Sequence, residues 1–423
     1  MYKRQVLALT CSEVIACGAA IRAVDVDVHS LTLDLGPLAE LPDLSAFRAA
    51  VPCMETALTS LPALRTFRLA NSGRIGPFQF IRPSRQYVSL LMPVLARLPQ
   101  QECLDLVAND IDATELAPPL ACLPALTALH LHGNIRDKPD AAAIIAPALS
   151  RLSRLASLTL AGDQHGSSFL CADAFIALPL GYLTALTALD LSNNSLHGAA
   201  LAPALDSLRQ LAVLNLKDNF VGFGDGGLGP EGAAALAPPL GRLAALTALN
   251  LDNNCFKGDS MEALAPALSR LSRLARLVLC KNEMGAAATA ALAPPLGLLT
   301  ALTLLDLSFN FTRTSGAAAL APSLRRLSML ADLDLSHNDI CSRGVAALAP
   351  ALASLTALTR LDISGNTISD RGCRRLAPAL THLTALRRLA FKTYSGISAA
   401  GVAAVLDAVP ASVWIAPLYN HRR

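Results

Sequence analysis

The sequence is poor in aromatic residues and nearly balanced in charge. Aromatic residues make up only 4% of its 423 residues, although hydrophobic residues make up 53%. A core with so few rings has to be filled by leucine and alanine. The formal net charge of +3 is too small for the basic surface that nucleic acids or anionic membranes attract. We therefore expect neither a nucleic acid nor a membrane as the partner.

The chain also lacks the short motifs that mark catalytic and cofactor-binding sites. It contains no G-x-x-x-x-G-K-[ST] phosphate loop and no signature of a serine hydrolase, protein kinase or zinc protease. We therefore predict no catalytic residue, no cofactor and no metal ion, and we expect a binding protein rather than an enzyme.

The ten cysteines show no C-x-x-C pair and no metal-ligand spacing. Free thiols in a reducing compartment explain them most simply, which places the protein in the cytoplasm. Positions such as Cys122, Cys341 and Cys373 are expected to be small core residues. Glu13 interrupts the short apolar run near the start, so we do not expect a signal peptide.

One long uncharged stretch has the hydropathy expected of a membrane-spanning helix. Residues 285–305 contain no charged side chain, and about 20 apolar residues suffice to cross a bilayer. However, Pro294 and Pro295 lie in the middle, and equivalent places elsewhere in the chain carry Arg242, Arg270 or Arg325. We therefore predict that this stretch belongs to a water-soluble repeat.

What the sequence does contain is a repeated phrase, L-x-x-L-x-L-x-x-N, between Leu126 and Asn366. Its closing asparagines recur every 28 residues over much of this stretch, at Asn254, Asn282, Asn310, Asn338 and Asn366. A fixed period of this length is typical of a solenoid. A solenoid offers a long surface for another macromolecule, so binding is the expected function.

Residues 330–357 show what one repeat should form. The alternation in Leu333-Asp334-Leu335 predicts a short strand with both leucines on one face. A buried Asn338 can then bond loop backbone groups that no strand partner reaches. Leu348 and Leu352 follow at helical spacing and should pack on the strand leucines. Each repeat is therefore predicted to be strand, turn and helix.

A proline recurs near the end of each predicted helix, always after Leu-Ala, at Pro203, Pro238, Pro266, Pro294, Pro322, Pro350 and Pro378. Proline lacks the backbone N–H and clashes with the carbonyl four residues earlier. We therefore expect short outer helices that kink or end at the proline.

The array is expected to be one evenly built domain with less regular ends. Residues 1–100 are predicted to form an irregular N-terminal cap with degenerate repeats, including a strand near residues 28–35 and an insertion at residues 74–87. Residues 101–394 should form regular repeats, and residues 395–423 a C-terminal cap, because terminal repeats need their open edges covered.

Two further features of the sequence are candidate sites. Residues 222–227 read G-F-G-D-G-G in a repeat that is lengthened to 35 residues; this is either a rim loop or a weak match to a phosphate-binding fingerprint. The preceding interval, from Asn194 to Asn219, is three residues short and should also be irregular.

His130 and His132 point the same way from one strand, near Asp105, and are either exposed histidines or metal ligands.

The repeat L-x-x-L-x-L-x-x-N-x-I-x-x-x-G-x-x-x-L resembles the ribonuclease-inhibitor type of leucine-rich repeat over residues 101–394. That class also occurs in GTPase activators of Ran and in the sensor arms of nucleotide-binding receptors. The resemblance implies an α/β fold, a right-handed solenoid or horseshoe, with parallel strands on the concave face and short helices on the convex face. It also implies a protein ligand on the concave face or its rim.

The outward strand positions supply candidate binding residues. Asp306, Asp334 and Asp362 should stack on successive strands about 4.8 Å apart, with Arg360 and Arg388 beside them. They are either a site for a basic partner or simply the habitual L-D-L-S strand of the repeat. Phe309 is either an exposed anchor for a partner or a cover for its own repeat.

We therefore interpret the chain as a protein–protein interaction scaffold without catalysis, expected to be a cytoplasmic monomer that binds another protein. Two alternatives are kept. A GTPase activator of the Ran type would need a strongly acidic tail, whereas the chain ends in Asn420, His421, Arg422 and Arg423. A receptor sensor arm would need a nucleotide-binding domain, for which the sequence has no phosphate loop.

Overall fold

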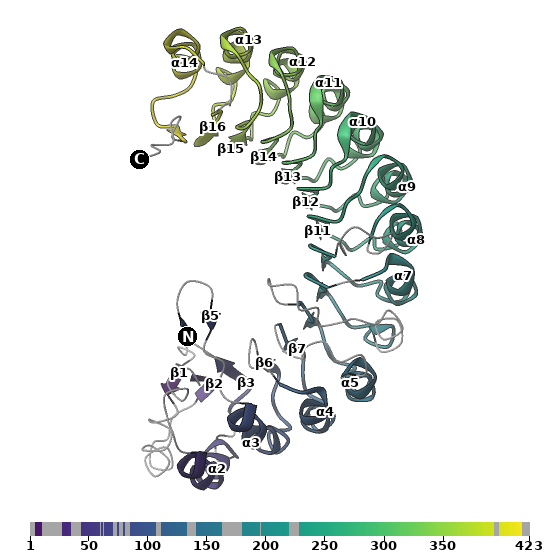
Figure 1. Cartoon of the computed structure of the whole chain (residues 1–423), viewed down its shortest axis with the longest axis vertical. Coiled ribbons are helices and arrows are strands. Elements are labelled where there is room, and N and C mark those ends of the chain that lie inside the picture. The colour runs from purple at the N-terminus through teal and green to yellow at the C-terminus, as the bar shows by residue number, and fades with distance from the viewer. Residues whose placement is uncertain are drawn as a thin grey trace. The chain divides into compact units, whose positions relative to one another are not determined.

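The computed structural model describes residues 5–10, 28–34, 44–59, 61, 63–70, 74–75, 79–80, 85–106, 111–132, 141–162, 180–194, 196–219, 228–392 and 397–416. The chain divides into two compact units, Met1–Ser195 and Leu196–Arg423, coloured along the chain in Figure 1. The expectation of one evenly built domain stays a prediction. The boundary falls within the short interval from Asn194 to Asn219, where three residues of a regular repeat are missing. The division at residues 100 and 394 remains a prediction.

In unit 1 (residues 1–195) parallel strands pair in chain order. They are β1 (Gln5–Thr10), β2 (Val28–Asp34), β3 (Thr66–Ala70), β6 (Cys103–Asp105), β7 (Ala128–His130), β8 (Ser157–Thr159) and β9 (Ala188–Asp190). The helices are α2 (Leu44–Thr59), α3 (Arg85–Leu95), α4 (Ala113–Ala121) and α5 (Ala141–Leu149). A separate antiparallel pair, β4 (Arg74–Ile75) and β5 (Gln79–Phe80), lies in the predicted insertion.

Unit 2 (residues 196–423) is more regular, and its strands also pair in parallel and in chain order. They are β10 (Val213–Asn215), β11 (Ala248–Asn250), β12 (Arg276–Val278), β13 (Leu304–Asp306), β14 (Asp332–Asp334), β15 (Arg360–Asp362), β16 (Arg388–Ala390) and β17 (Trp414–Ile415).

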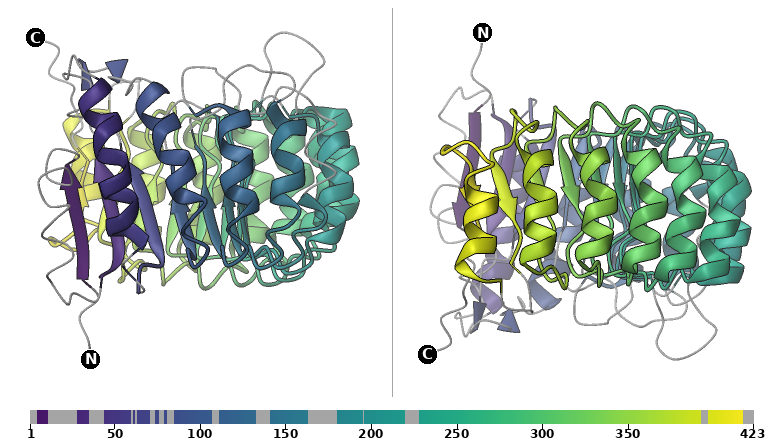
Figure 2. Two further views of the ribbon diagram at one scale, coloured as in Figure 1. Left: turned by 90° about the horizontal axis from the view of Figure 1, so that it is seen from below. Right: turned by 90° about the horizontal axis from the view of Figure 1, so that it is seen from above.

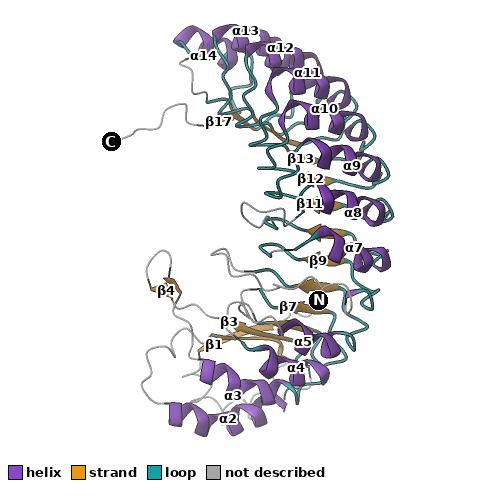
Figure 3. Cartoon of the chain, turned by 45° about the vertical axis from the view of Figure 1, so that its right-hand side comes forward, coloured by secondary structure: helices purple, strands orange, loops and turns teal. Residues whose placement is uncertain are grey.

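The helices of unit 2 form one row, seen side by side in Figure 2. They are α7 (Gly198–Ser207), α8 (Pro230–Leu240), α9 (Gly258–Leu268), α10 (Gly285–Leu296), α11 (Arg313–Leu324), α12 (Ser342–Leu352), α13 (Asp370–Leu380) and α14 (Ala399–Leu406). Figure 3 shows the helices on one side of the strands. We call the opposite side of β10 to β17 the strand face. The predicted α/β solenoid of parallel strands and helices is confirmed.

The core of unit 2 is a leucine lattice between strands and helices. In the repeat that starts at Leu330, the strand leucines and the helix leucines are all at most 1% exposed: Leu330, Leu333, Leu335, Leu348, Leu352 and Leu355. Burying one leucine side chain contributes roughly 1.5–3 kcal/mol. The period-two pattern in the strand and the helical spacing after it therefore predict the packing correctly.

The asparagine column is buried and hydrogen-bonded to the backbone, as predicted. Asn310 is 0% exposed, and its Nδ2 donates to the backbone oxygens of Leu279 at 2.7 Å and Leu307 at 3.0 Å. Its Oδ1 accepts the backbone N–H of Asn282 at 2.9 Å. The same link from one repeat to the next joins Asn219 to Asn254, Asn254 to Asn282, Asn310 to Asn338, and Asn338 to Asn366. The column therefore ties successive turns together.

The prediction for the prolines is only partly correct. The outer helices are short, and α12 has 11 residues. However, α12 continues past Pro350 and ends two residues later, at Leu352. Because the proline lies in the last turn, only one hydrogen bond to an earlier carbonyl is missing, and the turn can close beyond it.

The uncharged stretch at residues 285–305 forms part of one repeat, as predicted. It forms α10, the following turn and β13 of one repeat. In the described part of the chain, no helix is both long enough and apolar enough to cross a membrane.

At the N-terminus the predicted strand near residues 28–35 is confirmed as β2. The sequence did not predict β1, which pairs with β2 in parallel. At the other end β17 pairs with β16 and adds one more strand to the sheet. The predicted C-terminal cap region therefore contributes a strand.

Candidate binding surface

The three predicted aspartates are brought together on the strand face of unit 2. Asp306 pairs with Asp334 across β13 and β14, and Asp334 pairs with Asp362 across β14 and β15. The leucines beside them point to the other side and are buried. Alternation along each strand therefore places the carboxylates on the face away from the helices.

One oxygen of each aspartate has a structural role. The Oδ1 atoms of Asp306, Asp334 and Asp362 accept the backbone N–H two residues later, at 2.9–3.0 Å. Asp190, Asn215 and Asn250 make the same bond at the equivalent place. This bond satisfies an N–H at the end of each short strand. It explains why L-D-L-S recurs, and it leaves the second oxygen for other partners.

Arg360 uses that second oxygen. Its guanidinium donates to Asp332 at 2.9 Å, to Asp334 Oδ2 at 3.0 Å and to Asp362 Oδ2 at 3.4 Å. Burial alone would lower the pKa of Arg360, but Asp332 and Asp334 raise it above its ordinary value. The expectation that a cation relieves the repulsion between these aspartates is therefore correct for Arg360.

Asp306 has no such cation. Among the described residues, no lysine or arginine lies within ion-pair distance of its carboxylate. Burial raises the pKa of Asp306, the bonds from Ser308 lower it, and the charge of Asp334 raises it further, with a net upward shift. We call Asp306, Asp332, Asp334, Asp362 and Arg360 the acidic cluster; four carboxylates and one guanidinium give it a formal charge of −3.

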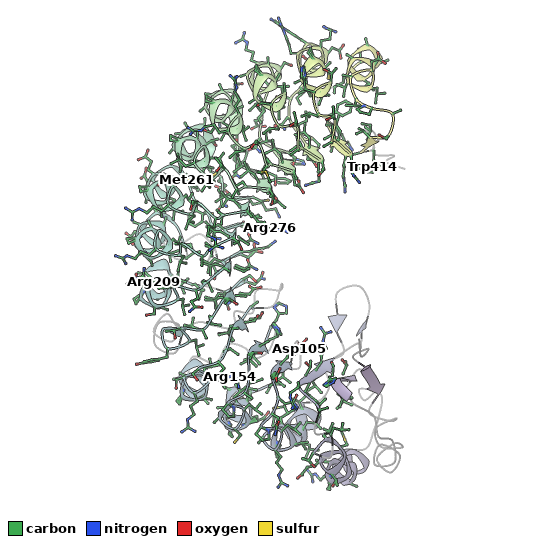
Figure 4. All side chains as sticks on the ribbon, turned by 180° about the vertical axis from the view of Figure 1, so that it is seen from behind. Asp105, Arg154, Arg209, Met261, Arg276 and Trp414 are labelled. Atoms are coloured by element: carbon green, nitrogen blue, oxygen red, sulfur yellow. The ribbon has the colours of Figure 1, made fainter. Side chains whose placement is uncertain are left out.

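Arg388 does not join the cluster. It lies beside Arg360 in the strand register, but its guanidinium carbon is 4.6 Å from the ring centre of Trp414, which is 50% exposed. Figure 4 shows Trp414 on the strand side of unit 2, with Arg276, while Arg209 lies among the helices. Arg388 therefore lies next to Arg360 in the sheet, but an aromatic face on β17 holds its guanidinium. Its role in binding stays a prediction.

Phe309 covers a neighbouring repeat and remains exposed. Its ring stacks on His337, with ring centres 4.1 Å apart and planes 8° apart. The Lys281 ammonium lies 6.0 Å from the centre of the same ring. Even so, 43% of Phe309 is exposed. The position is compatible with an exposed anchor for a partner, while the ring contacts join Phe309 to the neighbouring repeats rather than to its own.

Comparisons with known proteins bear on the repeat itself. A family model described as "Leucine Rich repeat" matches residues 326–349 and 354–377. These segments contain β14 and β15 and parts of α12 and α13. The chain therefore contains leucine-rich repeats.

No curated protein sequence matches the chain. Among solved structures, an internalin from Listeria monocytogenes is similar, with 17% identity over 86% of this chain and 83% of that chain and a TM-score of 0.44. This similarity is too low to establish a shared fold.

In unit 1, two residues of the suggested metal site have other partners. Nδ1 of His130 lies 3.0 Å from Thr159 Oγ1, and Asp105 forms an ion pair with Arg68 at 2.8 Å. In the ranges that the structure describes, no group of three histidine, cysteine, aspartate or glutamate side chains is arranged to hold a metal ion. The glycine-rich segment at residues 222–227 and the tail at residues 420–423 lie outside the described residues.

The cysteines at the six described positions are free thiols. Their burial differs from the prediction, because Cys373 is buried, Cys341 is half-buried and Cys122 is exposed. Cys280 occupies the place of Ser308 on the strand face, and burial raises the pKa of its thiol to about 12. That thiol stays protonated at neutral pH and is a poor nucleophile.

Sequence reasoning missed a second column in the leucine-rich repeats, made of the residue before each column asparagine. In unit 2 this residue has a φ of +53° to +66°, at Asp218, Asn253, Lys281, Phe309, His337 and Gly365. We call it the rim column. Its N–H bonds a carbonyl of the next repeat, as from Phe309 to Ser336 at 3.0 Å. The pairs Asp218-Asn219 and Asn253-Asn254 were a usable signal, because aspartate and asparagine tolerate this conformation.

Proposed function

We propose that the chain is a non-catalytic scaffold, built of ribonuclease-inhibitor-type repeats, that binds a basic protein on the strand face of unit 2. The acidic cluster is the observation that supports this proposal. Its formal charge is −3, and three of its four carboxylates are held in place by backbone N–H groups at the strand ends. Preorganised charges of one sign favour a partner of the opposite sign and speed its association.

The proposed binding residues are those already expected from the sequence, with different roles. Asp306, Asp334 and Asp362 supply the negative charge, and Arg360 holds two of them in position. Phe309 supplies exposed apolar area at the edge of this face. Arg388 marks the end of the surface, next to Trp414. A few anchors of this kind usually carry most of the binding energy of an interface.

The 28-residue strand register supports the ribonuclease-inhibitor type. Leu277 pairs with Leu305, Leu305 with Leu333, and Leu333 with Leu361, each 28 positions further along the chain. The six free thiols support a reducing compartment, and we propose that the protein acts in the cytoplasm as a monomer.

Affinity capture from a cell extract tests the proposal, with the protein as bait and mass spectrometry as the readout. The variant Asp334→Asn/Asp362→Asn deletes two charges and keeps both Oδ1 acceptors for the strand N–H groups. A basic protein bound by the wild type should be lost with this variant and should dissociate as salt is raised. We expect binding to weaken by about 1–3 kcal/mol.

The matched control is Asp190→Asn/Asp252→Asn, which removes the same charge outside the acidic cluster. It should leave the capture unchanged. If both double variants lose the partner equally, or if neither does, the acidic cluster is not the binding site.

A further inference from the structure

We propose that the rim of unit 2 around Phe311 binds an arginine or lysine side chain of the partner. The surface consists of Phe309, Phe311, His337, Glu283 and Asp339, and we call it the rim patch. This inference rests on the proposed function, because it adds to the same binding surface and assigns the chemistry of what is held there.

The first observation is the exposure of two aromatic rings in a chain that has few. Phe309 is 43% exposed and Phe311 is 49% exposed, on either side of the fully buried Asn310. The core does not need a ring at position 311. The core does use the ring of Phe256, which is 0% exposed. Phe256 occupies the repeat position that comes one residue after the position of Phe311. In the following repeats that position is occupied by Met284, Thr312 and Ile340.

The second observation is backbone strain. Phe309 has φ of +55° and Phe311 has φ of +53°, a conformation that costs a side chain other than glycine about 1–2 kcal/mol. Asparagine, aspartate and glycine tolerate it best, and they occupy the rim column at Asp218, Asn253 and Gly365. A bulky ring at such a position is retained against local stability, which favours a functional reason for it.

The third observation is the charge around Phe311. Equivalent positions one repeat before and one repeat after are Glu283 and Asp339, whose φ values of +51° and +52° match that of Phe311. Glu283 already pairs with Lys257 at 3.2 Å. Among the described residues, Asp339 has no ion-pair partner. In the repeat register the position of Phe311 is therefore followed by that of a carboxylate, Asp339, that is able to receive a cation.

The contacts of the Phe309 ring show which groups an aromatic ring on this rim can bind. One contact is the His337 ring at 4.1 Å and another is the Lys281 ammonium at 6.0 Å. In the part of the chain that the structure describes, no ring or cation contacts Phe311. A guanidinium stacked on Phe311 could pair with Asp339 at the same time, and this combination suits arginine better than lysine.

The rim patch is continuous in sequence with the acidic cluster. Asp306 lies three residues before Phe309 in the same repeat, and Asp334 lies three residues before His337. A basic segment that neutralises the aspartates on the strand face therefore meets the aromatic rim where each strand ends. The expected occupant is an arginine-containing stretch of a protein partner.

The probe is a fluorescein-labelled peptide of alternating glycine and arginine, and its binding to the full chain is followed by anisotropy. Phe311→Ala and Asp339→Asn should each raise Kd by about threefold to fivefold, as expected for an exposed cation–π or ion-pair contact. The controls are Leu298→Ala and Met329→Ala, which remove exposed apolar side chains elsewhere in unit 2. They should leave Kd within about twofold. Circular dichroism confirms that each variant is folded.

The variant Asp334→Asn/Asp362→Asn separates this inference from the proposed function. If that variant weakens the peptide and Phe311→Ala does not, the rim patch is rejected and the strand-face proposal stands. If only Phe311→Ala weakens it, the rim patch stands and the acidic cluster is rejected. A wild-type chain that binds the arginine peptide no better than a glycine–glutamate peptide would overturn the inference.

Discussion

Two neighbouring columns of unit 2 have opposite properties. The column asparagines are 0% exposed from Asn219 to Asn366, and their side chains join one repeat to the next. The residues just before them adopt positive φ, and two of them in successive repeats are Phe309 and His337. Both columns lie in the turn that follows each strand, but it is the side chains of the asparagine column that hydrogen-bond the backbone of that turn. The other is available for contacts with a partner.

The largest expected effect is in the asparagine column. Asn338→Ala removes the acceptor of the backbone N–H groups of Asn310 and Thr312 and the donor to Leu307. Because these groups are buried, we expect the free energy of unfolding to fall by about 3 kcal/mol. Denaturant titration measures it, with Arg326→Ala on the exposed surface as the control. A loss below about 0.5 kcal/mol would show that the column is dispensable.

The next effect comes from the rim column. Gly365 has φ of +66°, and an added Cβ would lie 2.5 Å from Nδ1 of His337. Gly365→Ala should therefore lower the free energy of unfolding by about 2 kcal/mol, through strain and through the clash. In the background His337→Gly the clash is gone, so the same substitution should cost about 1 kcal/mol less. Equal costs in both backgrounds would show that His337 does not pack on Gly365.

A smaller effect is expected when the charge of Asp306 is removed and its hydrogen bond to the backbone is kept. Asp306→Asn keeps the Oδ1 acceptor for Ser308 but removes the half-buried charge. Because the folded-state pKa of Asp306 is raised, the folded protein binds more protons, and stability falls as pH rises from the ordinary value of 3.8 through the folded pKa. The variant should be more stable at neutral pH by less than about 1 kcal/mol and should lose this pH dependence. An unchanged pH profile would contradict the assignment.

Much of the fold could be predicted from the sequence because the repeat is local. Leu333 and Leu335 on one strand and Leu348 and Leu352 on one helix already specify which faces pack together, and Asn338 specifies the turn. The strand β1 was missed because its sequence, Q-V-L-A-L-T, carries no asparagine and stands outside the register. The helix end at Leu352 was missed because a proline in the last turn removes only one hydrogen bond.

The candidate site was predicted less completely. The alignment of Asp306, Asp334 and Asp362 follows from the 28-residue period, and so does the approach of Arg360. The preference of Arg388 for Trp414 does not, because β17 belongs to no repeat phrase. The positive φ of Phe309 and Phe311 was also out of reach, since phenylalanine gives no local signal for that conformation and only the equivalent Asp218 and Asn253 do.

The most direct test of this account measures stability and binding together for two adjacent substitutions. Phe309→Asn places a residue that tolerates positive φ at the rim, and Asn310→Ala removes a buried column residue. We predict that Phe309→Asn changes the free energy of unfolding by less than about 1 kcal/mol and weakens the arginine peptide. Asn310→Ala should lower stability by about 3 kcal/mol. Equal losses of stability in the two variants, with peptide binding unchanged by Phe309→Asn, would contradict the division of roles between the two columns.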